Sequence, residues 1–137
     1  MRISGKGYYK ELYGTIVSFA FNAVQKKDGS ITGHLAFEAS YITIKATLDC
    51  IRMEDNLWIL SGVITHSKGI EKDWILPGYR WQLAFEDNGE GDSGAPDRMS
   101  GLGFGGSYLT CNEEGGINRA TPNEIIGNVQ VKKNKVF

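Results

Sequence analysis

Residues 15–37 read TIVSFAFNAVQKKDGSITGHLAF, and they contain two segments in which apolar and polar residues alternate. A period of two is typical of a β-strand with one buried face. Between the segments, Asp28-Gly29 favours the positive φ angles of a tight hairpin turn. The stretch therefore predicts two antiparallel strands joined at residues 27–30, with Phe19 and Phe21 on the inner face of the first and Leu35 on that of the second.

The same alternation recurs along the chain, and no segment has the period of an amphipathic helix. The stretch from Leu57 to Thr65 is apolar at both odd and even positions, which is typical of a central strand covered on both sides or of one that lines a filled barrel. We expect residues 1–137 to form a single all-β domain, an antiparallel β-sandwich or closed barrel of seven to eight strands. The expected strands are residues 13–23, 31–38, 42–50, 57–65, 79–86, 99–104, 108–111 and 125–131.

The composition agrees with this fold class and restricts the partners. Of 137 residues, 41% are hydrophobic, 11% are aromatic and 18 are glycines, which suits strands with many tight turns. The net charge of −1 gives no general attraction to nucleic acid or anionic lipid. No apolar run approaches the roughly 20 residues of a membrane span. We therefore expect neither nucleic acid nor a membrane span among the partners of this domain.

Two cysteines, Cys50 and Cys111, could form one disulfide, but a single pair is too few to indicate a disulfide framework. The composition alone favours two buried or half-buried thiols. Whether the two residues are bonded stays open at this point, and Cα atoms more than about 7 Å apart would exclude a bond.

Several motifs resemble catalytic or cofactor sites without their context. Residues 91–96, Gly-Asp-Ser-Gly-Ala-Pro, match the nucleophile segment of chymotrypsin-like proteases, but the histidine motif and the chain length of those enzymes are missing. Residues 101–106 match a dinucleotide-binding glycine pattern, but no helix is expected after them. His34 and His66 are far apart and lack cysteine neighbours at zinc spacing. We assign no catalytic residue and no transition-metal site.

The loop from Glu86 to Asp97 is acidic and rich in glycine. Carboxylate oxygens on a flexible loop can surround Ca²⁺, which takes six to eight oxygen ligands. The spacing does not fit an EF-hand, and a solvated loop in which Asp97 caps the next strand is the simpler interpretation. If calcium binds, the candidate ligands are Asp87, Glu90, Asp92 and Asp97.

Aromatic residues form the other candidate site. Trp58 and Trp81 fit the core, as most such residues do. Trp74 lies beside charged residues and before Pro77-Gly78, which favours exposure. An exposed aromatic ring can bind the flat face of a sugar, so the candidate ligand-binding residues are Trp74, Tyr79 and Tyr108.

The order of short motifs along the chain resembles an uncharacterised family of bacterial β-rich domains that lie near the C-terminus of secreted or surface proteins. Lys6 stands where a third glycine is usual in that family, and the region 112–122 is enlarged. The resemblance implies no catalytic residues, an extracytoplasmic location, and a Met1 that was added to an excised segment. The matching residues are 3–7, 15–22, 33–37, 58–66, 87–90, 97–100 and 126–131.

These observations favour a non-catalytic extracytoplasmic β module with a binding or structural role. Its ligand is unknown, with carbohydrate and another protein module as candidates. The first alternative is a β-barrel carrier, whose small apolar ligand would lie among Phe19, Phe21, Leu35 and Trp81. The second alternative is a small hydrolase or isomerase with acidic residues on its strands.

Overall fold

The computed structural model describes residues 1–11, 14–54, 57–69, 75–87, 97–106, 109–112 and 123–132. These residues form eleven strands and no helix. The strands are β1 (Arg2–Lys10), β2 (Ile16–Gln25), β3 (Ile31–Ala39), β4 (Ile42–Thr47), β5 (Cys50–Glu54), β6 (Leu57–Gly69), β7 (Arg80–Glu86), β8 (Arg98–Met99), β9 (Gly103–Gly105), β10 (Asn123–Glu124) and β11 (Ile126–Lys132). The all-β prediction is confirmed.

Nine of these strands follow one another in a single hydrogen-bonded order, β10-β8-β7-β6-β4-β3-β2-β1-β11. β5 pairs with β6 and β9 pairs with β7 outside this order. The pairings are antiparallel, and β10 and β11, at the two ends of the order, are separated in the chain by Ile125 alone. The sheet therefore returns almost to its starting point and forms a nearly closed barrel.

The prediction of seven to eight strands is wrong, because the described residues already contain eleven. β1 was not expected, since glycines at positions 5 and 7 occupy its inner face and hide the alternation. The expected strand 42–50 ends at Thr47, where the chain turns a corner, with Leu48 N donating to Gly33 O and Asp49 N donating to Ser61 O. A separate strand, β5, which was not expected, begins at Cys50. Conversely, β6 continues to Gly69, beyond its expected end at Thr65.

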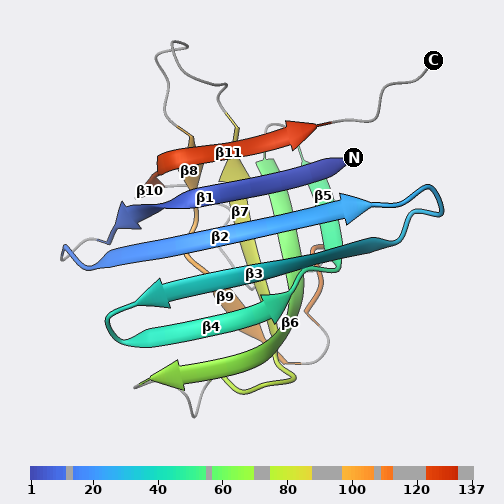
Figure 1. Cartoon of the computed structure of the whole chain (residues 1–137). Helices are drawn as coiled ribbons and strands as arrows, with labels where there is room; N and C mark the ends of the chain where they lie inside the picture. The colour runs from blue at the N-terminus through green and yellow to red at the C-terminus, as the bar shows by residue number, and fades with distance from the viewer. Residues whose placement is uncertain are drawn as a thin grey trace.

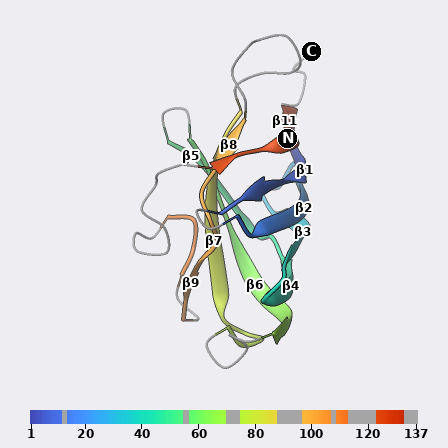
Figure 2. The ribbon, with the colours of Figure 1, turned by 90° about the vertical axis from the view of Figure 1, so that its left-hand side faces the viewer.

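The barrel is flattened into two layers whose strands cross steeply (Figures 1 and 2). The front sheet consists of β11, β1, β2, β3, β4 and the end of β6. The back sheet consists of β5, the first part of β6, β7, β8, β9 and β10. β6 belongs to both, since Leu57–Val63 pair with β7 and Ile64–Gly69 pair with β4 across a register shift. A strand that changes sheet through such an irregularity is how orthogonal sheets are joined.

Gly62 lies where β6 leaves the back sheet, and no other residue fits there. A Cβ atom at this position would come within 1.8 Å of Thr47 O. The same carbonyl accepts a hydrogen bond of 2.9 Å from the indole Nε1 of Trp81. The backbones of β4 and β6 therefore meet at a corner that is packed without spare volume.

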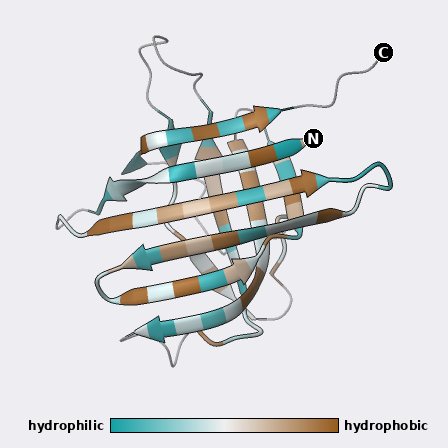
Figure 3. Cartoon of the chain, in the orientation of Figure 1, coloured by the Kyte–Doolittle hydropathy of each residue, from teal (hydrophilic) through white to brown (hydrophobic). Residues whose placement is uncertain are grey.

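The core lies between the two sheets. The burial of β2 alternates as the sequence predicts, with Val17, Phe19 and Phe21 inside. On the neighbouring front strand β4, Figure 3 shows apolar and polar residues in alternation. The rings of Phe19 and Phe21 lie 5.9 Å apart, and that of Phe21 lies 5.5 Å from Phe85 on the back sheet. Aromatic rings thus fill the centre of the barrel.

Asp97 links the two ends of the strand order. Its carboxylate Oδ2 accepts a hydrogen bond of 3.0 Å from Val129 N in β11, and its carbonyl accepts one of 2.9 Å from Ile125 N. Asp97 is buried and directly precedes β8. Its side chain therefore replaces a missing strand pairing at the seam between β11 and the back sheet.

Candidate functional site

The outer surface of the back sheet, here called the covered face, is not available to a ligand at its centre. Ile59 and Ala84 point outward from β6 and β7 and are fully buried against Cys111. Residues 109–112, the covering segment, lie over them. Gln82 Nε2 donates to Thr110 O at 2.8 Å, and Arg80 Nε donates to Leu109 O.

A disulfide between Cys50 and Cys111 fixes the covering segment to β5, with the two Cα atoms 5.6 Å apart. The preference for two thiols was therefore wrong. Composition could not indicate the bond, because a disulfide requires that the two cysteines be close in space. Here they are 61 positions apart in the chain, and only the fold brings them together. The expectation that Leu57–Thr65 is covered on both sides is confirmed for Ile59, which is buried beneath this segment.

The outer surface of the front sheet, here called the open face, is different. The register of the pairs places side chains from adjacent strands in rows across it. One row consists of Lys6, Ala20, Ala36 and Lys45, on β1, β2, β3 and β4. Because the two central side chains are single methyl groups, the middle of the row is low and the lysines rise on either side.

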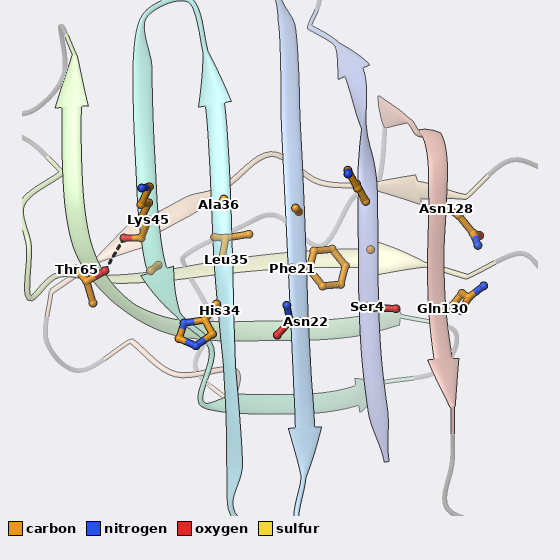
Figure 4. A pocket seen from close by; sticks show the side chains of 14 residues that line it. Ser4, Phe21, Asn22, His34, Leu35, Ala36, Lys45, Thr65, Asn128 and Gln130 are labelled. Carbon is orange, nitrogen blue, oxygen red and sulfur yellow. Dashed lines mark hydrogen bonds between the residues drawn. The ribbon is translucent and has the colours of Figure 1, made fainter.

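This low centre is part of a hollow of about 690 Å³. Asn22 on β2 and His34 on β3 project into the middle of the hollow, while Asn128 and Gln130 line it on the β11 side (Figure 4). Thr65, at the irregularity of β6, closes the other side and donates its hydroxyl to Lys45 O at 3.1 Å. The polar side chains that line the hollow are Ser4, Lys6, Asn22, His34, Lys45, Thr65, Asn128 and Gln130.

A second hollow of about 420 Å³ adjoins the first and shares Lys6, Ala20, Ala36 and Lys45 with it. Its far end is lined by Tyr8, Ser18, Glu38 and Thr43. Together the two hollows form one groove, here called the open groove, which runs along the strands of the front sheet. Tyr8 is 38% exposed and offers an aromatic surface at one end.

Most of the charged side chains on the open face are positive. Among the described residues whose side chains point outward from the front sheet, six are Lys or Arg and one, Glu38, is acidic. The chain as a whole has a net charge of −1. The positive charge is therefore concentrated on this face. The six cationic residues are Arg2, Lys6, Lys10, Lys45, Lys68 and Lys132.

A third, smaller cavity of about 180 Å³ lies at one end of the barrel, between Tyr9, Glu11 and Tyr41. Tyr41 donates its hydroxyl to Glu11 Oε1 at 2.5 Å. Burial, and then the charges of Glu11 and Tyr41, raise the pKa of the Tyr9 phenol above its ordinary value of 10.0. This cavity is too small for a polymer chain.

The predicted aromatic residues lie away from the open groove or outside the described residues. Tyr79 is 39% exposed and precedes β7, where its carbonyl accepts a hydrogen bond from Ile64 N. It does not line either hollow. Trp74 and Tyr108 lie outside the described residues, so their assignment stays a prediction.

The predicted calcium ligands are described in part. Asp87 is half-buried at the end of β7, and Asp97 is buried at the seam, while Glu90 and Asp92 lie outside the described residues. Within the described ranges, no three His, Cys, Asp or Glu side chains gather as metal ligands would. The calcium site stays a prediction, and the carboxylate of Asp97 already has a structural partner in Val129.

Sequence reasoning did not find the open groove. Its signal lay in the outward set of the alternating positions, to which no function was assigned. Two alanines at outward positions, Ala20 and Ala36, were the visible anomaly, because small apolar residues there leave a depression between longer neighbours. Only the register of the strands shows that Ala20 and Ala36 are paired with each other and flanked by Lys6 and Lys45.

No helix within the described ranges has the length and hydropathy to cross a bilayer. Searches against family models, curated proteins and solved structures give no match to this chain. The resemblance to the bacterial β-rich family therefore stays a prediction, and the site has to be interpreted from its own geometry.

Proposed function

We propose that this domain is a non-catalytic binding module, and that a carbohydrate chain lies in the open groove. The observation that carries the proposal is the groove itself, which extends along the strands and is lined by amide, hydroxyl and amine groups. Such groups match the hydroxyls of a sugar chain, and Tyr8 offers a ring for the apolar face of one sugar.

The rigidity of the front sheet supports a binding role. Its strands pair along their full lengths, and the groove residues stand on strands rather than on loops. A groove that exists before the ligand arrives loses little entropy when the ligand binds. Among the described residues that line the open groove, Glu38 is the one carboxylate, whereas glycoside hydrolysis requires a pair.

The Cys50–Cys111 bond supports the proposal of an extracytoplasmic location. Disulfides form and persist in oxidising compartments and are rare in the cytosol. A secreted or surface module that binds polysaccharide outside the cell agrees with this bond and with the family resemblance.

The carrier alternative receives less support. It requires space among Phe19, Phe21, Leu35 and Trp81, but these side chains are buried, and the ring of Phe21 packs against the rings of Phe19 and Phe85. A small apolar ligand would have to displace packed rings, which costs more than it gains.

Affinity electrophoresis through gels that contain single soluble polysaccharides, neutral and acidic, tests the proposal. We expect at least one polysaccharide to retard the protein. Ala36→Trp, which fills the floor of the groove, should abolish the retardation. Thr32→Trp is the matched control, because Thr32 is exposed on the same strand and face but lines neither hollow.

No retardation by any polysaccharide in the panel would refute the carbohydrate proposal. Equal loss of binding in the Ala36→Trp and Thr32→Trp variants would place the site elsewhere. Circular dichroism of both variants should show the same strand content as the unmodified protein, which excludes misfolding as the cause.

A further inference from the structure

We infer that the ligand of the open groove is an acidic polysaccharide, whose carboxylates pair with Lys6 and Lys45. This inference rests on the proposed function and names the chemical class of the carbohydrate. It follows from the sign of the charge on the open face and from the positions of the two lysines within the groove.

The two lysines occupy the ends of one cross-strand row. Three strand spacings separate β1 from β4, which places their Cα atoms roughly 14 Å apart. Both residues line both hollows, so a chain lying along the groove passes between them. Their ammonium groups can therefore reach acid groups on both sides of one bound chain.

Neither lysine has an ion-pair partner among the described residues. The ion pairs there are Arg52–Glu54, Arg80–Asp49 and Arg98–Glu124, all outside the groove. Lys6 and Lys45 are exposed, so their charges are not neutralised from within the fold. An anionic ligand would supply the missing partners.

The amide side chains that line the first hollow favour a sugar acid over other polyanions. Asn22, Asn128 and Gln130 each present both donor and acceptor groups, as hydroxyl-rich chains require. A single-stranded nucleic acid needs a series of aromatic rings for its bases. Among the described residues that line the groove, the outward-pointing aromatic rings are those of Tyr8 and His34, which lie on different strands and in different hollows and do not form such a series.

Glu38 sets the position of the acid groups along the groove. It lines the far end of the second hollow, next to Thr43 and Ser18 across the strands. A carboxylate of the ligand is repelled there and attracted to the row of Lys6 and Lys45. The same charge separation predicts that removing the Glu38 charge strengthens binding of a uniformly acidic chain.

Polygalacturonate and its fully methyl-esterified form are the matched probes, because they share a backbone and differ in charge. We expect isothermal titration at low ionic strength to give tighter binding of the acid than of the ester. Lys6→Gln and Lys45→Gln should each weaken binding of the acid about threefold, and the double variant about tenfold. Glu38→Gln should strengthen it about twofold to threefold.

Lys27→Gln is the control variant, because it removes the same charge from the exposed hairpin turn outside the groove. It should leave the affinity within a factor of 1.5 of the unmodified protein, as expected for about 0.2 kcal/mol or less at an exposed charge. Raising the salt concentration should weaken binding of the acid and have little effect on the double lysine variant.

Equal binding of the acid and the ester would overturn this inference and leave the carbohydrate proposal standing. Binding of neither, together with no retardation by other polysaccharides, would overturn both. Duplex DNA or phosphatidylserine vesicles that bind as tightly as polygalacturonate at the same salt concentration would overturn the inference, because the face would then recognise charge alone. Loss of affinity in Lys27→Gln equal to that in Lys6→Gln would have the same consequence.

Discussion

The two outer faces of this barrel are both built from antiparallel strands, but one is covered by another segment of the chain and the other is open. On the covered face, Ile59 and Ala84 are buried beneath a segment that a disulfide holds in place. On the open face, Ala20 and Ala36 form the floor of a groove between lysines. The comparison shows that an outward-pointing alanine does not by itself determine a surface, because Ala84 is buried beneath the covering segment whereas Ala36 is exposed.

Charge explains part of this difference. On the covered face, Arg80 is paired with Asp49 through two hydrogen bonds of 3.0 and 2.5 Å and also reaches the covering segment. The positive charge of Arg80 is therefore neutralised by a carboxylate of the same domain. The lysines of the open groove have no such partner among the described residues, so their charge remains available to a ligand.

Removing the disulfide should have the largest effect on the comparison. Cys50→Ala combined with Cys111→Ala releases a loop of 61 residues. The chain-entropy relation gives a loss of about 4 kcal/mol in the free energy of unfolding. Urea denaturation measures this loss, and polysaccharide binding by the remaining folded protein should be unchanged. Loss of groove binding under native conditions would show that the two faces are coupled.

The same substitution on the two faces tests the difference directly. Ala84→Trp places an indole into a fully buried cluster and should destabilise the protein by about 3 kcal/mol. Ala36→Trp places it on an exposed strand position and should change the stability by less than about 0.5 kcal/mol. Thermal denaturation of both variants gives the comparison. Similar melting temperatures would mean that the covering segment does not pack as described.

The interior between the two faces should respond to alkaline pH through Tyr9. Because the folded state raises the pKa of its phenol, the neutral form is favoured on folding, and this contribution is complete below pH 10. Above pH 10 the unfolded chain ionises first, and stability should fall by up to about 1.4 kcal/mol per pH unit. Urea denaturation from pH 9 to 11 should show this fall and a smaller one in Tyr9→Phe. An unchanged slope in the variant would assign the effect to other groups.

A serine on each face provides the smallest test. The Ser61 hydroxyl is buried on the back sheet and makes no hydrogen bond with the described residues, whereas Ser18 is exposed on the open face. Ser61→Ala should leave the stability unchanged or raise it by up to about 1 kcal/mol, because it removes an unsatisfied group. Ser18→Ala should have no measurable effect on the free energy of unfolding. Marked destabilisation by Ser61→Ala would indicate a partner for its hydroxyl.

Local alternation was sufficient to predict the fold class but not the number of strands. The hairpin of β2 and β3 was predictable because its inner positions are large and apolar and its turn contains Asp28-Gly29. β1 was not predicted, because Gly5 and Gly7 stand at inner positions where the fold needs little volume. At Gly5 the ring of Phe21 fills the place that a side chain would occupy.

The candidate sites depended on contacts that alternation cannot give. The disulfide and the seam at Asp97 join residues far apart in the chain, and no local pattern specifies such pairs. The row of Lys6, Ala20, Ala36 and Lys45 depends on the register of three strand pairings. A shift of one residue in any pairing would turn those side chains to the opposite face, so the groove is visible only once the register is known.

The pairing of β1 with β11 has a consequence for engineering. Arg2 lies opposite Lys132, so the first strand begins where the last strand ends (Figure 1). A short linker could join these points, and the chain could be reopened at the exposed turn around Gly29, whose φ of 88° is that of a tight turn. Such a circular permutant would keep every strand neighbour and could be inserted into a surface loop of a host protein.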